Sequence, residues 1–181
     1  MSIYCSNKLS DGRQLEFSSK YPLKSRFDEI SLFLREEFNE VCIFEDVIQE
    51  AVTTLYTGLS NCVLNQITLN LELEVGRVGE TWNNWTYSLS DVAEEDEEDI
   101  FQQYWIWSTR DFQTWVYQKD GRSYIEVSSS YRWHFVEPTE NEKVIPFDEF
   151  MKKYNSVIVE LSIKQINNIL KSLEKIKCDC N

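Results

Sequence analysis

The sequence has few of the residues that interrupt regular structure. It holds five glycines and three prolines among 181 residues, with an ordinary share of hydrophobic side chains. Disordered and linker-rich chains have a different composition, so we expect a single folded domain over residues 1–181. No apolar run approaches the roughly 18 residues of a membrane span, and the first residues lack the apolar core of a secretory signal. We therefore expect a cytoplasmic protein without a membrane partner.

Histidine is almost missing, since His134 is the only one. Catalysis by a Ser-His-Asp or Cys-His group would have to use this residue, and His-rich zinc centres are excluded. It lies between Trp133 and Phe135 in a segment that alternates like a strand, where a solvent-facing or hydrogen-bonded histidine is commoner than a catalytic base. Residues 76–79 (GRVG) match no phosphate-binding fingerprint. We predict no catalytic residue, no metal and no cofactor.

The cysteines do not form a metal or disulfide pattern. They are Cys5, Cys42, Cys62, Cys178 and Cys180. The count is odd and no Cys-x-x-Cys occurs, so we expect free thiols in a reducing compartment. Two thiols within residues 177–181 are too few for a site, and we expect that stretch to be a frayed tail.

Basic side chains are scarce in the middle of the chain. Residues 36–109 hold sixteen acidic side chains and one basic side chain, Arg77, while the whole chain has a net charge of −13. Such a field repels nucleic acid and anionic lipid, which we exclude as direct partners. It attracts basic proteins and raises their association rate at low salt. An acidic surface without a partner is the alternative explanation.

The acidity peaks in a run from Asp91 to Asp99, where seven of nine residues are carboxylates. We expect an exposed loop or the exposed start of a helix, because these charges repel one another unless water, a cation or a basic partner compensates them. An aromatic block follows, and large aromatics commonly anchor interfaces, although core packing is their alternative role. The predicted partner-binding residues are Asp91, Glu94, Glu95, Asp96, Glu97, Glu98, Asp99, Trp105, Trp107, Trp115 and Tyr117.

Apolar spacing predicts an α+β fold: an antiparallel meander of about five to six strands, two helices in the amino-terminal half and two at the carboxyl end. Spacings of three and four residues predict helices over 27–41 and 45–57, the second ending at Gly58. Residues 146–154 predict a short helix with acids in its first turn, and Ser162 is placed to cap a final amphipathic helix.

Alternation of apolar and polar residues predicts the strands. The clearest alternation covers 67–75, with leucines and valine on one face and glutamates on the other. Shorter segments at 13–18, 82–89, 131–135 and 157–161 are predicted strands as well.

A β-hairpin is predicted around the Asp-Gly pair at 120–121, a strong two-residue turn signal. The turn fixes a register in which Tyr117 pairs with Tyr124. One face of the hairpin then carries Thr114, Val116, Ile125 and Val127, a compact core surface. The other face carries Trp115, Tyr117, Tyr124, Lys119, Arg122 and Glu126. Trp105 and Trp107 join this aromatic face if their segment is extended, forming a wide platform for peptides, sugars or basic side chains.

These features favour a non-enzymatic binding protein that neutralises a basic protein partner. Nuclease toxins are basic because they bind phosphates, and an inhibitor that places carboxylates on those basic side chains gains speed and specificity. Bacterial immunity proteins have this general character. The likeness is one of physical type, because no stretch matches a family motif. We expect a monomer or a small homo-oligomer.

Three other functions fit parts of the sequence. A DNA-charge mimic or other acidic adaptor shares the electrostatics and differs in its partner. A small-molecule or carbohydrate binding domain would use the aromatic face and would not depend on the acidic run. A carboxylate- or metal-dependent enzyme would use Glu72, Glu74 or Asp91, although Glu72 and Glu74 are most simply the solvated face of a strand.

Overall fold

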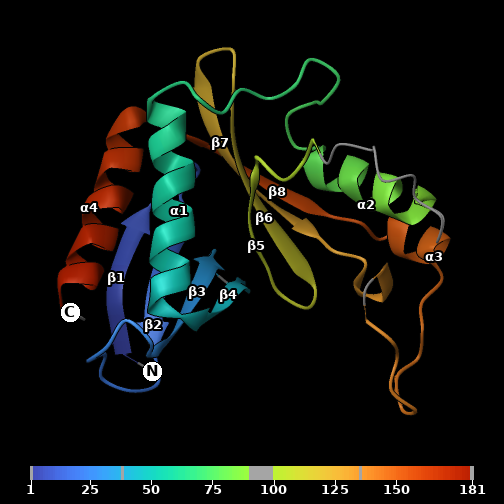
Figure 1. Ribbon diagram of the computed structural model, residues 1–181, viewed down its shortest axis with the longest axis horizontal. Coiled ribbons are helices and arrows are strands. Elements are labelled where there is room, and N and C mark those ends of the chain that lie inside the picture. The colour runs from blue at the N-terminus through green and yellow to red at the C-terminus, as the bar shows by residue number, and fades with distance from the viewer. Residues whose placement is uncertain (1, 38, 90–99, 135, 180–181) are drawn as a thin grey trace.

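The computed structural model describes residues 2–37, 39–89, 100–134 and 136–179, with side chains up to residue 177. Within these residues, eight strands form two antiparallel four-stranded sheets (Figure 1). Sheet A contains β1 (Ser2–Lys8), β2 (Gln14–Ser19), β3 (Glu29–Arg35) and β4 (Glu40–Val47). Sheet B contains β5 (Trp105–Ser108), β6 (Phe112–Lys119), β7 (Arg122–Ser129) and β8 (Ser156–Leu161). The helices are α1 (Ile48–Val63), α2 (Val78–Ser88), α3 (Phe147–Met151) and α4 (Ile163–Asp179), with a 3-10 turn η1 (Arg132–His134).

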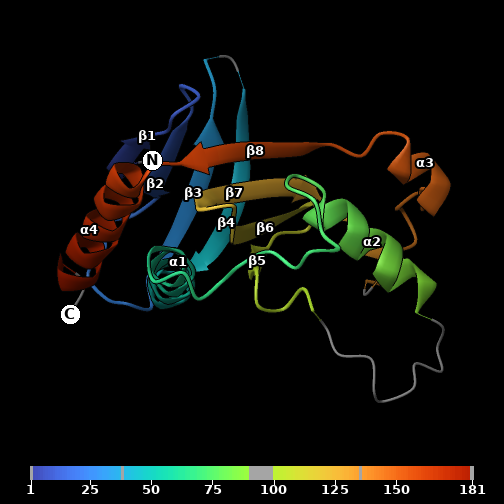
Figure 2. The same cartoon turned by 90° about the horizontal axis from the view of Figure 1, so that it is seen from above.

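Each sheet is a meander, because its strands neighbour one another in chain order. A long helix follows each meander, α1 after β4 and α4 after β8. The order of four strands and a long helix thus occurs twice, although the sequence contains no internal repeat. The two long helices lie side by side (Figures 1 and 2). The α+β class is confirmed, and the expected count of five to six strands is too low.

One hydrophobic core joins the two sheets and the two long helices. Leu32 of β3 and Ile125 of β7 both point into it, together with apolar side chains of α1 and α4. The rings of Phe44 and Trp107 meet in this core, with their centroids 4.8 Å apart. Because both meanders contribute to the same core, they form a single domain.

The central strands of sheet B, β6 and β7, are buried on both faces. The second face of the sheet packs against α2 and the segment 64–77 through a cluster around Trp115 and Tyr117. Figures 1 and 2 place α2 and α3 at the end of the molecule remote from α4. The predicted hairpin is confirmed: β6 and β7 pair in the expected register, with Tyr117 opposite Tyr124.

The helix predicted over 27–41 is wrong, because this stretch contains β3 and the start of β4. Ile30, Leu32 and Leu34 alternate along β3 and point into the core. Positions 30 and 34 satisfy a helical spacing as well as strand alternation, so periodicity is ambiguous here. The pairing of Leu32 with Phe17 on β2 belongs to the tertiary structure, and it decides in favour of the strand.

The strand predicted over 67–75 is also wrong, because this segment is a loop with turns. Ile67 and Leu73 are buried against sheet B, whereas Leu71 is 92% exposed. The loop touches β6 through an isolated bridge at Thr68. Alternating hydrophobicity here reflects individual side chains that cover sheet B, and not the pleat of a strand.

The strand predicted over 82–89 is wrong because α2 occupies the segment. Trp82 and Asn83 lie on the buried side of this helix, next to β6 and β7. Asn83 fixes the helix by hydrogen bonds: its Nδ2 donates to the carbonyl of Ser129 at 3.1 Å, and its Oδ1 accepts from the backbone nitrogen of Tyr131 at 2.9 Å. A polar residue at the centre of the contact removes the apolar stripe by which sequence analysis recognises a helix.

The second predicted helix exists as α1, with shifted ends. It begins at Ile48, because Glu45 and Asp46 still belong to β4. It continues past Gly58 to Val63, so the stop predicted at Gly58 is wrong. A Cβ at this glycine would lie 2.5 Å from Cδ1 of Ile106, so the missing side chain permits a close approach between α1 and β5.

The carboxyl-terminal elements follow the sequence prediction closely. α3 and β8 are confirmed, and so is the capped final helix α4. Ser162 Oγ accepts a hydrogen bond from Gln165 N at 3.3 Å, and Gln165 Oε1 accepts one from Ser162 N at 2.9 Å, which forms a capping box. The strand predicted over 131–135 is wrong, because η1 lies there. The tail predicted over 177–181 overlaps α4, which continues to Asp179, and residues 180–181 lie outside the described residues.

Candidate functional site

The acidic run that led the sequence analysis lies outside the described residues. Asp91, Glu94, Glu95, Asp96, Glu97, Glu98 and Asp99 all belong to this part of the chain. The run contributes −7 of the net charge of −13, so all other residues together carry −6. Its two flanks are described. Leu89 follows the end of α2, and Phe101 is buried in the aromatic cluster on sheet B.

Among the four predicted aromatic contact residues, Trp105 alone is exposed, at 43%. Trp107, Trp115 and Tyr117 are each at most 3% exposed. The register of β5 against β6 shifts between Trp105 and Trp107, so the two tryptophans do not share one face. Trp107 enters the main core, while Trp105 stays at the surface. The wide aromatic platform expected from the sequence is therefore not an exposed surface, and the binding role of these residues stays a prediction.

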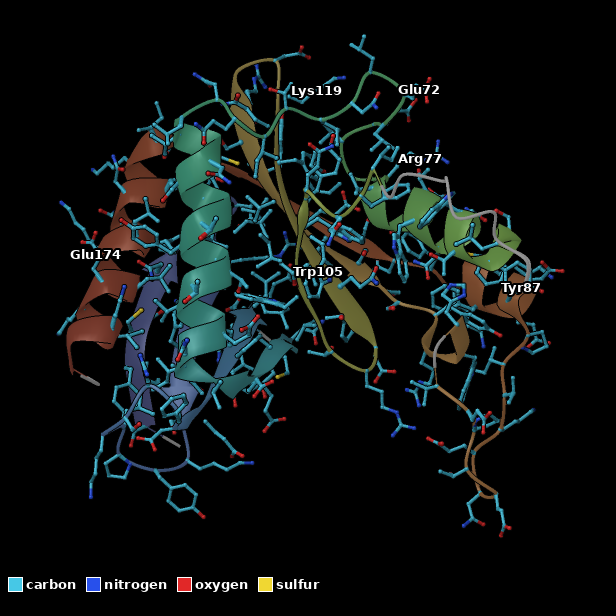
Figure 3. The ribbon with its side chains drawn as sticks, in the orientation of Figure 1. Glu72, Arg77, Tyr87, Trp105, Lys119 and Glu174 are labelled. Carbon is cyan, nitrogen blue, oxygen red and sulfur yellow. The ribbon has the colours of Figure 1, made fainter. Side chains whose placement is uncertain are left out.

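A pocket of about 540 Å³ opens beside Trp105. We call it the Trp105 pocket. Its aromatic lining comes from several parts of the chain: Trp82 of α2, Phe101 before β5, Trp115 of β6 and Tyr131 after β7. Figure 3 labels Trp105 on β5, between α1 and α2. The pocket was not predicted, because it depends on α2, which the sequence analysis assigned as a strand.

The rim of the Trp105 pocket carries two arginines, Arg110 and Arg132. Arg110 forms an ion pair with Glu142. Arg132 forms an ion pair with Asp111 and lies 3.7 Å from the same Glu142. Two cations and two carboxylates therefore balance one another at the rim.

Strand β6 contributes two buried side chains, Gln113 and Trp115, to the lining of the Trp105 pocket. Trp115 is held by a hydrogen bond from its Nε1 to Ser128 Oγ at 3.0 Å. Gln113, two residues earlier on the same strand face, also lines the pocket and is 5% exposed. Its Oε1 accepts no hydrogen bond from any described residue. A buried amide oxygen without a donor is uncommon in folded proteins and costs stability.

A buried carboxylate that was not predicted from the sequence lies next to this region: Glu126 is 0% exposed. Tyr117 Oη donates a 2.7 Å hydrogen bond to its Oε2. The backbone nitrogens of Gly79 and Val78, at the start of α2, donate to its two oxygens at 2.9 and 3.4 Å. Burial raises the pKa of Glu126 and outweighs the opposing effect of these hydrogen bonds. Glu126 thus fixes the first turn of α2 on sheet B, where the helix dipole favours a carboxylate.

His134 lies in a ring cluster and not on an open strand face. Its ring centroid is 5.0 Å from that of Tyr131, 5.5 Å from that of Trp82 and 5.8 Å from that of Phe147. Burial among these rings lowers the pKa of His134 to about 4. The residue is therefore neutral near pH 7, and packing accounts for its position.

This environment predicts the titration of the only histidine. In a proton NMR titration, the ring signal of His134 should shift with a midpoint near pH 4 in the folded protein, and near 6.5 in the urea-unfolded chain. Because the folded state favours the neutral ring, its contribution to stability is present above the unfolded pKa and is lost as the pH falls toward 4. A folded-state midpoint at 6.5 would contradict the half-buried position of the ring among its aromatic neighbours.

The other groups weighed in the sequence analysis form no reactive centre in the described part of the chain. Glu72 and Glu74 are exposed in the loop before α2, and Glu74 lies 3.5 Å from Arg77. Figure 3 labels Glu72 and Arg77 in this part of the molecule. No cluster of metal-ligating side chains occurs among the described residues. Cys62 is a free thiol whose burial raises its pKa to about 11, which makes it a poor nucleophile. No helix within the described ranges is long and apolar enough to cross a bilayer.

Comparison of the chain with models of protein families, with curated proteins and with solved structures found no match.

Proposed function

We propose that this chain is a non-enzymatic binding protein that neutralises a basic protein partner, in the manner of an immunity-type inhibitor of a nuclease-like toxin. The observation that carries the proposal is the junction between the acidic run and the Trp105 pocket. Phe101 and Gln102 line the pocket, and they follow Asp99 by two and three residues. Since consecutive Cα atoms are about 3.8 Å apart, the end of the run is covalently held within roughly 8 Å of Phe101.

This arrangement supplies the two parts that such an interface needs. The run carries seven carboxylates, which would attract a basic surface from a distance and orient it. Trp105 is an exposed aromatic beside a pocket, the type of position at which binding energy concentrates. Together they would produce fast, salt-dependent association and slow dissociation.

The described surface adds a second acidic region. Residues 36–76 contain no basic side chain. Cations from sheet A pair with some of its carboxylates: Arg13 with Glu36, Arg35 with Glu40 at 2.8 Å, and Lys20 with Glu45 at 3.4 Å. The carboxylates in this region that form no ion pair with any described residue are Glu37, Asp46, Glu50 and Glu72. This region extends the negative field, although its ion pairs make it weaker than the run.

The proposal is tested with the purified products of genes adjacent to the one that encodes this chain. A basic protein among them should bind in surface plasmon resonance, with an association rate that falls roughly tenfold or more from low to high salt. Replacing the six acids from Glu94 to Asp99 with Ser and Gln should remove most of this dependence. Trp105→Ala should mainly accelerate dissociation.

A matched variant separates the run from net charge alone. It replaces six exposed acids outside the acidic middle of the chain with Gln, and these are Glu29, Glu137, Glu140, Glu149, Glu160 and Glu174. This variant should keep most of the wild-type association rate. Equal losses in both variants, or a rate unaffected by salt, would count against the proposed interface. A partner that competes with DNA for this chain would point instead to a DNA-charge mimic.

A further inference from the structure

A second pocket lies at one end of sheet A, lined by the loop 20–28 and by side chains of β3 and β4. We call it the Ser31 pocket, and its volume is about 240 Å³. Figure 1 shows the loop between β2 and β3 at the lower end of the sheet, remote from α2. The Ser31 pocket shares no lining residue with the Trp105 pocket. It is therefore a separate place at which a guest could bind.

The outer face of sheet A supplies three polar side chains to the Ser31 pocket. Ile30 and Leu32 point into the core. Glu29 and Ser31 therefore point to the opposite face, because successive side chains of a strand alternate. Ser31 lies opposite Glu45 of β4, and such residues bring their Cβ atoms within about 4.5–5.5 Å of each other. Two carboxylates and one hydroxyl thus share one end of this face.

Ser31 is a buried serine whose hydroxyl has no partner. Its side chain lines the pocket, the residue is 6% exposed, and its Oγ forms no hydrogen bond with any described residue. The neighbouring Ser18 of β2 is also unpaired. Ser18 Oγ is closed off from solvent, whereas Ser31 Oγ is not. A guest in the pocket therefore reaches an oxygen that the protein itself leaves unsatisfied.

The carboxylates of the Ser31 pocket are available to a cation. Glu29 is exposed and forms no ion pair with any described residue. Glu45 lies 3.4 Å from Lys20, but both side chains are more than half exposed, and such pairs are weak. The third carboxylate of the lining, Asp28, accepts hydrogen bonds from two backbone nitrogens of the loop at 2.6 and 2.8 Å. Asp28 thus holds the loop, while Glu29 and Glu45 face a guest.

Two exposed rings complete the lining. Tyr21 is 73% exposed and Phe27 is 63% exposed, and both line the Ser31 pocket. Arg26 already lies over the ring of Phe27, with its guanidinium carbon 4.8 Å from the ring centroid, although Arg26 itself does not line the pocket. Aromatic faces attract cations, and their apolar surface covers alkyl chains. The pocket therefore combines negative charge with rings that are open to a guest.

We propose that the Ser31 pocket binds a primary alkylammonium group. Such a group has three N–H donors and no acceptor, and Glu29, Glu45 and Ser31 supply three acceptors. Its alkyl chain lies against Tyr21 and Phe27. A guanidinium has five donors in a fixed plane, more than these three side chains satisfy. The inference does not rest on the proposed function, because it uses neither the acidic run nor the Trp105 pocket.

The test compares three probes that share a butyl chain. Butylamine is charged at pH 7, butanol is neutral, and trimethylbutylammonium keeps the charge without any N–H donor. Binding is followed by NMR through the backbone amide signals of residues 29–31 and 45 in the ¹⁵N-labelled protein. Butylamine should bind roughly fivefold or more tightly than the quaternary cation, because hydrogen bonds to a charged group are lost in the latter. Butanol should give no saturable shift.

Two pairs of variants assign the contacts. Ser31→Ala should weaken butylamine binding roughly fivefold or more, whereas Ser18→Ala, in the buried neighbour outside the lining, should leave the affinity unchanged. Glu29→Gln should weaken binding several-fold. Glu50→Gln removes the same charge from an exposed position on α1 and should have little effect. Circular dichroism confirms that each variant is folded.

Lys20 provides a prediction of opposite sign. Lys20→Gln frees the carboxylate of Glu45 and should tighten butylamine binding several-fold. Lys24→Gln removes the same charge from an exposed loop position outside the lining and should change the affinity less. Equal effects of the two variants would contradict a direct contact between the guest and Glu45.

Nα-Acetyllysine methylamide identifies the source of the ammonium group. Binding at least as tight as that of butylamine supports the site as one for a lysine side chain of a protein, and several-fold weaker binding supports it as one for a free amine. Replacing the acids from Glu94 to Asp99 should leave butylamine binding nearly unchanged, so failure of the proposed interface and failure of this site are distinguishable. No saturable shift with butylamine, equal binding of the quaternary cation, or an affinity unaffected by Ser31→Ala would overturn the proposal.

Discussion

Glu126→Ala is expected to lower the free energy of unfolding by about 3 kcal/mol, since removal of a buried carboxylate leaves several buried donors without an acceptor. The donors are Tyr117 Oη and the backbone nitrogens of Val78 and Gly79. Two of them belong to the first turn of α2, which has no side-chain cap of its own. The loss should therefore also release α2 from sheet B. Chemical denaturation measures the fall in the free energy of unfolding, and hydrogen exchange of the α2 amides measures the release of the helix.

Glu160→Ala is the matched control for this variant. Glu160 lies on the neighbouring strand β8, but its side chain is 51% exposed and its partner Arg122 is 3.4 Å away. Such exposed ion pairs contribute roughly 0–1 kcal/mol, so the control should be close to wild type. Similar losses of stability in the two variants would show that the buried, hydrogen-bonded carboxylate of Glu126 stabilises the fold no more than an exposed one does.

The same carboxylate predicts a pH dependence with a definite sign. Because burial raises the pKa of Glu126 above the ordinary value of 4.5, the folded chain holds this proton more tightly than the unfolded chain does. Its contribution to stability is therefore fully present below pH 4.5 and is lost as the pH rises through the folded-state pKa. Glu126→Gln removes this component. If the free energy of unfolding of Glu126→Gln depends on pH above 4.5 in the same way as that of the wild type, the raised pKa of Glu126 is contradicted.

Gly79→Ala is the second variant with a large expected effect, a destabilisation of about 2 kcal/mol or more from overpacking. A Cβ at this position of α2 would lie 2.0 Å from Ser128 Oγ and 2.5 Å from Ser128 Cβ. Because carbon atoms normally approach to about 3.5–4.0 Å, α2 would have to move away from β7 by roughly 1 Å. That movement would also lengthen the 2.9 Å hydrogen bond from Gly79 N to Glu126.

A double-mutant cycle identifies the cause of this loss. Combining Gly79→Ala with Ser128→Gly removes both clashing atoms, while Ser128→Gly also removes the acceptor of the Trp115 Nε1 hydrogen bond. The double variant should therefore lose less stability than the sum of the two single losses. Gly58→Ala provides a comparison at another helical glycine, where the nearest atom is the flexible end of Ile106. It should cost less, because that methyl group can move. Additive losses in the cycle would rule out the steric explanation.

The parts of the fold that were predicted correctly are those set by local chemistry. The turn at 120–121 determines the register of β6 and β7 without help from other residues, and Tyr117 lies opposite Tyr124 as expected. Ser162 and Gln165 likewise form their capping box within one turn of α4. Such features need no knowledge of the rest of the chain.

The parts that were predicted wrongly depend on distant partners. Ile30 and Leu34 fit a helix and a strand equally well until β2 pairs with Leu32. Ile67 and Leu73 are apolar because they cover sheet B, an arrangement that periodicity does not encode. Asn83 holds α2 by polar contacts to residues 129 and 131, so its segment lacks the apolar pattern of a helix.

The candidate site was foreseen in its composition and not in its geometry. Trp105 and Trp115 were predicted contact residues, and both line one pocket together with Trp82, whose segment was predicted to be a strand. The shift in register between Trp105 and Trp107 sends the second of these into the core. One irregularity in a four-residue strand thus leaves Trp105 at the surface and buries Trp107, where the sequence predicted one wide aromatic face.

The position of α4 has a consequence for the order in which this chain acquires its structure during synthesis. α4 packs on α1 and on β1, and Ser172 Oγ donates a 3.2 Å hydrogen bond to Asn7 Oδ1 across 165 residues. Sheet A and α1 therefore leave the ribosome long before the helix that covers them. Contacts so distant in sequence form slowly, because a long loop must close first. Until α4 emerges, the flank of α1 stays open to water, and nascent chains are most prone to aggregate during that interval.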